Sequence, residues 1–210
     1  MPDNLSGMPF PQPDMLRPVV SPLVEERCLD VEDIKTTKAG KKSQVVIRVD
    51  GDEHPSSDAL EELSRDISAA FDAAEENGQL NFGAGYTLEV STPGVDLPLT
   101  APRHWRRNRG RLASITFGDK SAKPEKWRIG AVGTFANGAP ADAANNGANP
   151  EAVALFKQSK KQLLSRIEQL ENIAHAVVEI EFARVPEAEK EAAGLPFAQA
   201  VEKAAVKRED

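Results

Sequence analysis

The densest group of side chains that could do chemistry lies between Arg103 and Arg111, where five arginines stand in nine positions around one indole, Trp105. Guanidinium groups form bidentate contacts with phosphate and stack on bases, and an indole offers a further stacking face. The segment therefore indicates an RNA-facing surface. Its candidate residues are Arg103, His104, Trp105, Arg106, Arg107, Arg109 and Arg111. The structural alternative is that Trp105 is buried between two domains, while the arginines form a linker that pairs with acidic side chains.

Catalytic and metal-binding patterns are weak in this chain. Paired glutamates such as Glu61 and Glu62 could exchange protons with a substrate, but pairs of this kind on amphipathic helices usually form a solvated face. The single cysteine, Cys28, is expected to be a small core residue, and the three histidines have no spacing that would hold zinc. We therefore expect no enzymatic activity, no metal and no cofactor.

Charge is distributed unevenly along the chain. The formal net charge of -7 over 210 residues is unfavourable for a partner made of nucleic acid. Residues 18–99, however, carry 7 basic and 17 acidic side chains, whereas residues 100–185 carry 14 basic and 8 acidic ones. An acidic half joined to a basic half predicts two surfaces with different partners. The change of sign also predicts a domain boundary near residue 100.

The first half of the chain has the pattern of one compact α/β domain. Its expected elements are a helix, two strands forming a hairpin, a helix and a strand, over residues 21–28, 29–35, 45–50, 58–77 and 86–91. Ser21 is expected to cap the first helix, and a capping box at Asp58 is expected to start the second. Residues 1–14 contain four prolines and predict a flexible tail.

The second half is richer in strand patterns. Strands are expected at residues 110–117, 126–135 and 176–182, and glycines within the first two suit the tight bends of a small barrel. Residues 137–150 are rich in Ala, Asn and Gly and predict a mobile loop. Residues 151–175 fit either a helix or short strands, with the periodicity slightly favouring a helix. Residues 186–210 predict a charged, alanine-rich tail, with a frayed helix as the alternative.

The residues between the two halves resemble a known family. Residues 86–99 have the sequence Y-T-L-E-V-S-T-P-G-V-D-L-P-L, and Arg103-His104-Trp105, Arg107 and Gly110-Arg111 follow. This pattern is similar to the interdomain signature Y-x-L-E-V-S-S-P-G-hydrophobic-x-R-P-L…H-F-x-R-x-x-G-R of the RimP family of bacterial ribosome maturation factors. The interdomain motif is carried here by Glu89, Ser91, Pro93, Gly94 and Pro98. Leu97 stands where the family usually has arginine, so no polar contact is carried over to that position.

The resemblance covers residues 15–183 and implies an α+β protein. It implies an N-terminal α/β domain over residues 15–98 and a C-terminal SH3-like small β-barrel over residues 99–185, with the 137–150 loop and the terminal tails outside the usual pattern. It also decides residues 151–167 in favour of strands. The implied function is that of a cytoplasmic, non-enzymatic assembly factor. It would bind the free small ribosomal subunit, through a small-subunit ribosomal protein and ribosomal RNA, as a monomer without membrane contact.

Two other functions can be compared with this one. The first is an RNA-binding regulator that acts on non-ribosomal RNA through residues 103–111, and it predicts tight binding to short RNA with a steep salt dependence. The second is an enzyme, which has only the paired carboxylates in its favour and would need one such pair in a cleft.

Overall fold

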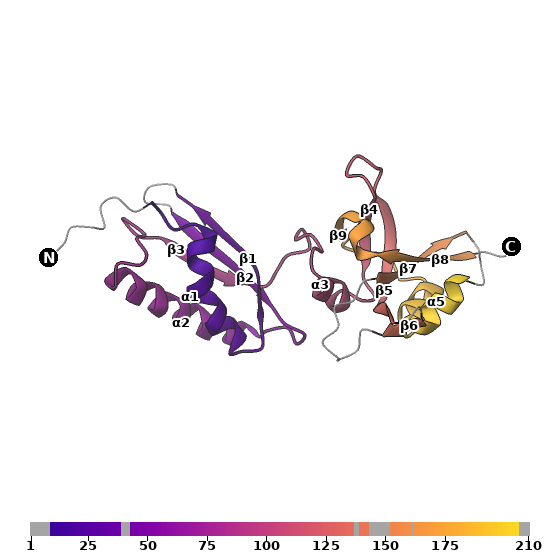
Figure 1. The fold of residues 1–210 in the computed structure, drawn as a ribbon, viewed down its shortest axis with the longest axis horizontal. Helices are drawn as coiled ribbons and strands as arrows, with labels where there is room; N and C mark the ends of the chain where they lie inside the picture. The colour runs from indigo at the N-terminus through magenta and orange to yellow at the C-terminus, as the bar shows by residue number, and fades with distance from the viewer. Residues whose placement is uncertain (1–8, 39–42, 137–138, 143–151, 161, 206–210) are drawn as a thin grey trace. The chain divides into compact units, whose positions relative to one another are not determined.

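The computed structural model describes residues 9–38, 43–136, 139–142, 152–160 and 162–205. The chain divides into two compact units, an N-terminal unit that ends at Gly94 and a C-terminal unit that begins at Val95. Figure 1 shows the helices and strands of each unit. Together they form a mixed α and β protein, with a helix-and-strand N-terminal unit and a C-terminal unit rich in β-strands.

The N-terminal unit has the expected order of helix, two strands, helix and strand. Its elements are α1 (Pro13–Glu25), β1 (Asp30–Thr37), β2 (Gln44–Asp50), α2 (Ser57–Glu76) and β3 (Thr87–Ser91). The sheet has the order β1-β2-β3, in which β1 pairs antiparallel with β2 as the predicted hairpin. Strand β3 pairs parallel with β2 because the connection between them crosses over through α2.

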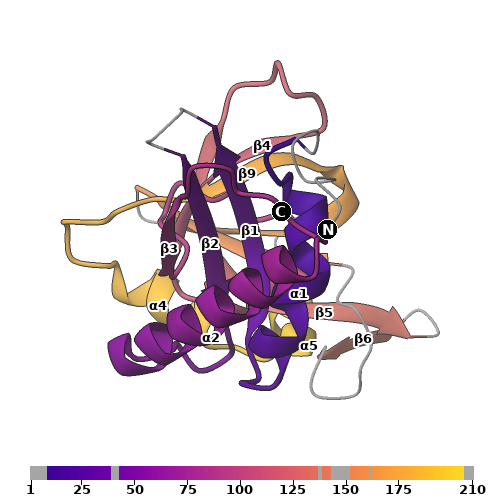
Figure 2. The same ribbon diagram turned by 90° about the vertical axis from the view of Figure 1, so that its left-hand side faces the viewer.

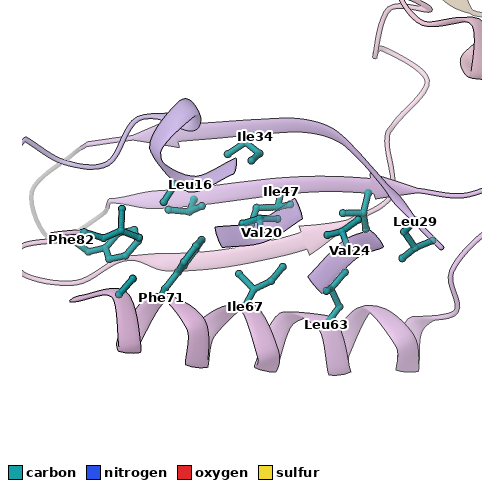
Figure 3. Packing of buried hydrophobic residues seen from close by; sticks show 14 of the residues in the cluster. Leu16, Val20, Val24, Leu29, Ile34, Ile47, Leu63, Ile67, Phe71 and Phe82 are labelled. Atoms are coloured by element: carbon teal, nitrogen blue, oxygen red, sulfur yellow. The ribbon is translucent and has the colours of Figure 1, made fainter. Parts of the chain in front are cut away.

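Both helices of this unit cover the same face of the sheet, as Figure 2 shows. Alternate residues of β2 are fully buried under them, and α2 contributes a stripe spaced by four residues that includes Leu63, Ile67 and Phe71. Figure 3 shows these side chains filling the space between helix and sheet. Each such side chain stabilises the fold by about 1.5–3 kcal/mol through removal from water. The periodic pattern in the sequence therefore found the core of this unit.

Three local predictions in this unit were wrong. Helix α1 begins at Pro13 and not at Ser21, and it contains Pro18 and Pro22, whose exposed rings leave the buried stripe of the helix intact. Residues 9–14 therefore do not form the expected tail, since Phe10 belongs to the core and α1 begins at Pro13, and residues 1–8 lie outside the described residues. Cys28 is exposed, because it takes a left-handed conformation (φ 56°) in the turn after α1 and does not point into the core.

The cap of α2 lies two residues before the position that the sequence indicated. The hydroxyl of Ser56 accepts a hydrogen bond from the N–H of Ala59 at 3.2 Å, so Ser56 and not Asp58 is the N-cap. Asp58 lies in the first turn, where its negative charge interacts favourably with the helix dipole.

The C-terminal unit contains the longer sheet. Its elements are α3 (Pro102–Arg107), β4 (Leu112–Phe117), β5 (Glu125–Ala136), β6 (Ala139–Asp142), β7 (Ala152–Ser159), β8 (Gln162–Gln169), the 3-10 turn η2 (Leu170–Asn172), β9 (Ile173–Val178), α4 (Glu187–Ala193) and α5 (Phe197–Ala205). The antiparallel strands have the order β8-β7-β5-β4-β9, and β6 pairs with β5. Strands β7 and β8 confirm the choice of strands over a helix for the described residues of the range 151–167.

The expected barrel is not established by this sheet. Strands β8 and β9 lie at opposite ends of the strand order, and the described residues show no pairing that closes the sheet between them. Part of the loop expected at 137–150 is also ordered, because Ala139–Asp142 pairs through its backbone with β5 as strand β6. Residues 137–138 and 143–150 of that loop lie outside the described residues.

Helices α4 and α5 occupy most of the segment that the sequence analysis set apart as a charged tail. They cover one face of the sheet, where Ala192, Ala193, Phe197 and Ala200 are buried against Phe156 of β7. The alanines allow a close approach of helix and sheet because their side chains are small. Strand β7 is therefore buried on both faces, which explains why all five residues from Ala152 to Phe156 are buried despite their alternating directions.

One glycine in this sheet has no room for a side chain. A Cβ atom on Gly130 would lie 2.6 Å from Cε2 of Phe156 and 2.9 Å from the carbonyl oxygen of Ala154. We expect Gly130→Ala to reduce the free energy of unfolding of the C-terminal unit by about 1–3 kcal/mol, because the ring and the strand must shift. Urea unfolding followed by tryptophan fluorescence measures this loss. A wild-type unfolding midpoint for Gly130→Ala would contradict the prediction.

Candidate nucleic-acid interface

Helix α3 places the first residues of the arginine-rich segment, and His104 holds its beginning. The ring nitrogen Nδ1 of His104 accepts hydrogen bonds from the N–H groups of Thr100 (3.0 Å) and Ala101 (3.1 Å), just before the helix. His104 is buried. Its observed contacts are thus those of a capping residue, which satisfies backbone donors that have no partner within the helix.

Trp105 is enclosed within the C-terminal unit. Its side chain is 2% exposed and packs in a cluster that includes Ile115, Ile129 and Leu155. The contacts of the indole therefore lie in the core of one unit and are not those of a residue buried between two domains. Because only 2% of its side chain is exposed, Trp105 does not offer a ring face on which a base could stack.

The arginines of the segment differ in exposure. Arg106, Arg109 and Arg111 are exposed, whereas Arg103 and Arg107 are partly buried. Arg109 donates hydrogen bonds to the carbonyl oxygens of Ala193 (2.7 Å) and Leu195 (2.8 Å), and Arg111 donates to the side-chain oxygen of Asn108 (3.3 Å). Carbonyl and amide groups do not neutralise a guanidinium, so these contacts orient Arg109 and Arg111 without removing their charge.

A buried arginine, which the sequence pattern did not reveal, contacts the backbone of the arginine-rich segment. Arg128 on β5 is 1% exposed, and its guanidinium donates to Glu189 at 2.8 Å and to both carboxylate oxygens of Glu181 at 2.7 and 2.8 Å. It also donates to the carbonyl oxygen of Gly110 at 2.9 Å. The second oxygen of Glu189 accepts the N–H of Gln158 at 2.6 Å, so α4 is joined to both β5 and β7.

This cluster changes the acidity of its members. Hydrogen bonds from Arg128 lower the pKa of the Glu181 carboxyl below its usual range, and the same bonds raise the pKa of Arg128. Both directions favour the charged forms, so the pair stays ionised under neutral conditions. The sequence carries one signal for this site, a charged residue directly between the two large apolar residues Trp127 and Ile129.

The residues of the interdomain motif lie in two places. Glu89 and Ser91 form a polar cluster within the N-terminal unit, and the remaining residues lie at or near the boundary of the two units. Glu89 accepts a salt bridge from Arg48 at 3.2 Å and a hydrogen bond from Gln44 at 3.3 Å, and the hydroxyl of Ser91 contacts both Arg48 and Glu89. These contacts connect β2 to β3 across their parallel pairing. Pro93 and Gly94 stand at the boundary of the two units, and Pro98 lies in the first residues of the C-terminal unit.

A groove of about 640 Å³ lies beside the edge strand β9. Its lining includes Pro98, Leu99, Trp105, Leu170, Ile173 and His175, and Glu171 is its carboxylate. Leu99 closes part of the strand edge, since its N–H donates to the carbonyl oxygen of Ala176 at 2.9 Å. The carboxylate pair that an enzyme would need is not in this groove, and Glu61 and Glu62 are exposed on α2.

The described part of the chain contains neither a metal-binding cluster nor a membrane-spanning helix. Within it, no group of three or more His, Cys, Asp or Glu side chains is arranged to hold a metal ion. Among its helices, none has the length and apolar character needed to cross a membrane.

Comparison with known proteins finds one family in both the family model and the individual relatives. Residues 19–96 match the model of the RimP N-terminal domain. The protein is 52% identical over 203 residues to the ribosome maturation factor RimP of Corynebacterium aurimucosum, covering 97% of this chain and 100% of the relative. It is 43% identical over 197 residues to that of Corynebacterium diphtheriae, covering 93% of this chain and 97% of the relative. The similarity therefore extends through both units.

Proposed function

The chain belongs to the RimP family of ribosome maturation factors, and on that premise we propose that it binds the free small ribosomal subunit and assists its assembly. It acts in the cytoplasm, as a monomer and without catalysing a reaction. The observation that carries this function is the close similarity over nearly the whole chain to proteins named for ribosome maturation. No chemistry is required of such a factor, because a higher affinity for the immature subunit than for the finished one is sufficient.

The two halves suit different components of a ribosomal subunit. Residues 18–99 carry an excess of ten acidic side chains, and residues 100–185 an excess of six basic ones. The acidic half fits a basic ribosomal protein, and the basic half fits RNA phosphates or an acidic protein surface. We assign residues 99–185 to a small barrel of the SH3 type, which the antiparallel sheet and the family membership support.

Within the arginine-rich segment, the exposed side chains are the better candidates for contact with the subunit. Arg106, Arg109 and Arg111 are the three exposed arginines there, whereas His104 and Trp105 are buried. The contacts of Glu89 and Ser91 connect two strands of the N-terminal unit, and Pro93, Gly94 and Pro98 lie in the chain segment that joins the units. We therefore assign subunit binding to the exposed arginines and a structural role to the interdomain motif.

Charge reversal tests this assignment. We expect Arg106→Glu combined with Arg111→Glu to weaken binding to free small subunits by about tenfold or more at low salt, because two attractive charges become repulsive. The measurement is sedimentation of the tagged full-length protein through a gradient with purified subunits. Lys120→Glu combined with Lys123→Glu is the matched control, since it changes the net charge equally at two exposed positions of the same unit.

Two results would contradict these proposals separately. Unchanged subunit binding by the double arginine variant would make the segment structural. Wild-type protein found on translating ribosomes, or never with free small subunits, would overturn the proposed function itself. Tight, salt-sensitive binding to short RNA without any subunit binding would favour a regulator of non-ribosomal RNA instead.

A further inference from the structure

An aromatic side chain is displayed on the C-terminal unit beyond strand β9. Phe182 is 95% exposed, and Ile180 is 59% exposed. The strand expected over residues 176–182 ends at Val178, so both lie in the segment that leads to α4, the orange-yellow loop entering α4 in Figure 2. Phenylalanine is among the residues most often buried in proteins, and two exposed apolar side chains in three positions call for an explanation.

The backbone that carries Phe182 is anchored on the opposite side. Glu179 donates its N–H to the carbonyl oxygen of Leu112 at 2.8 Å, and its carboxylate pairs with Lys126 at 3.1 Å. Glu181 receives the two hydrogen bonds from the buried Arg128. Alternate residues therefore hold the segment to the sheet, and the residues between them are turned outward. Phe182 is displayed by a fixed backbone, which limits the entropy lost when a partner binds its ring.

The same anchor places Phe182 beside the arginine-rich loop. One guanidinium, that of Arg128, contacts both Glu181 and the carbonyl oxygen of Gly110, so the residue after Glu181 lies next to the residues that flank Gly110. These are Arg109 and Arg111, both exposed. Arg184, also exposed, follows Phe182 by two positions. The chain segment that carries Phe182 and Arg184 thus lies close to the segment that carries Arg109 and Arg111, and all four side chains are exposed.

The local charge favours an anionic partner. Arg109 and Arg111 donate hydrogen bonds to neutral oxygens, so the positive charge of both side chains remains. The carboxylates of Glu179 and Glu181, in contrast, are paired with Lys126 and Arg128. An exposed aromatic ring on a segment close to exposed arginines is a combination with which proteins bind single-stranded nucleic acid, where the ring stacks on a base and the cations contact phosphates.

We propose that Phe182 stacks on an unpaired RNA base while Arg109, Arg111 and Arg184 contact the adjacent phosphates. The proposal rests on the proposed function for the source of this RNA, which is the ribosomal RNA of the small subunit. It gives to Phe182 the stacking role that the sequence analysis assigned to Trp105, whose ring is buried. The arginine-rich segment keeps its predicted phosphate contacts, but its aromatic partner comes from about 70 residues further along the chain.

Binding to a labelled ten-nucleotide oligoadenylate, measured by fluorescence anisotropy with the full-length protein, tests the stacking. We expect Phe182→Ala to weaken binding by about fivefold or more, since stacking on one base contributes about 1–3 kcal/mol. Phe182→Trp should bind at least as tightly as wild type, and Phe182→Leu should bind as weakly as Phe182→Ala. Leu164→Ala is the matched control, because Leu164 is an exposed apolar residue on β8.

The salt dependence of RNA binding separates the contribution of base stacking from that of phosphate contacts. Phe182→Ala should leave the slope of log K against log salt unchanged, whereas Arg111→Gln should reduce it by about 0.7 for one lost phosphate contact. Wild-type affinity of Phe182→Ala or of Phe182→Leu would overturn the stacking proposal. So would a wild-type protein that binds subunits but no RNA.

Sedimentation with small subunits keeps this proposal distinct from the proposed function. If Phe182→Ala loses subunit binding but retains RNA binding, Phe182 contacts a ribosomal protein and the RNA proposal is wrong. If wild type and Phe182→Ala both co-sediment equally well, the function stands and the Phe182 contact does not. Failure of wild type to co-sediment removes the function, and with it the ribosomal source of the RNA.

Discussion

Replacing Arg128 with methionine is expected to lower the free energy of unfolding of the C-terminal unit by about 3–5 kcal/mol. The side chain is 1% exposed and holds two carboxylates, one of which, Glu189, is itself buried. Removing the guanidinium leaves that carboxylate in the interior without its counter-charge, and it leaves the carbonyl oxygen of Gly110 without its side-chain donor. Helix α4 should loosen from the sheet as a result, because Glu189 is its connection to β5.

Both tryptophans of the chain, Trp105 and Trp127, lie in the C-terminal unit, so urea unfolding followed by tryptophan fluorescence reports on this unit. Arg128→Lys retains the charge but not the forked geometry and should show a smaller loss. Adding Glu189→Gln to Arg128→Met should restore part of the stability, because it removes the unpaired buried charge. A loss below about 1 kcal/mol for Arg128→Met would contradict the prediction, since that is the value of an exposed ion pair.

The same cluster predicts a dependence of stability on pH. The pKa of Glu181 in the folded protein lies below its usual range, so its contribution to stability is fully present above the unfolded pKa of about 4.3. It is lost as the pH falls through the lower, folded value. The difference between wild type and Arg128→Met should therefore shrink as the pH is lowered below about 4, and a constant difference across this range would contradict the assignment.

Trp105→Ala is the second variant with a large expected effect, a loss of about 3–5 kcal/mol in the free energy of unfolding. Its indole is 2% exposed in the cluster with Ile115 and Ile129, and truncation leaves a cavity that the neighbouring strands can fill only in part. Fluorescence of the remaining Trp127, together with circular dichroism, measures the unfolding. Trp105→Phe should lose less, because a smaller aromatic ring retains part of the packing.

The control for Trp105 is its neighbour on the same helix. Arg106 is exposed, and Arg106→Ala should change the free energy of unfolding by less than about 1 kcal/mol. If Trp105→Ala were as stable as Arg106→Ala, the indole could not be a core residue, and stacking on a base would return as its role. The two variants therefore separate the structural and the binding parts of one six-residue helix.

Much of the N-terminal unit could be predicted because its signals are local. The stripe of Leu63, Ile67 and Phe71 and the alternation along β2 follow from residues that are close in sequence, and both packed as the periodicity indicated. The start of α1 was missed because prolines at 18 and 22 oppose a helix locally, whereas burial of Leu16, Val20 and Val24 stabilises it. Residues 151–167 were ambiguous because β7 is buried on both faces, so its apolar residues do not alternate with polar ones.

The sequence by itself determined the family, the order of elements in the N-terminal unit and the cationic character of residues 103–111, because motifs and charges are properties of neighbouring residues. Only the tertiary structure decided which side chains of that segment are buried. The carboxylates that hold Arg128 are 53 and 61 residues away in the chain, and the cover over Phe156 comes from helices expected as a tail. Burial depends on contacts between distant segments, and a linear pattern does not contain them.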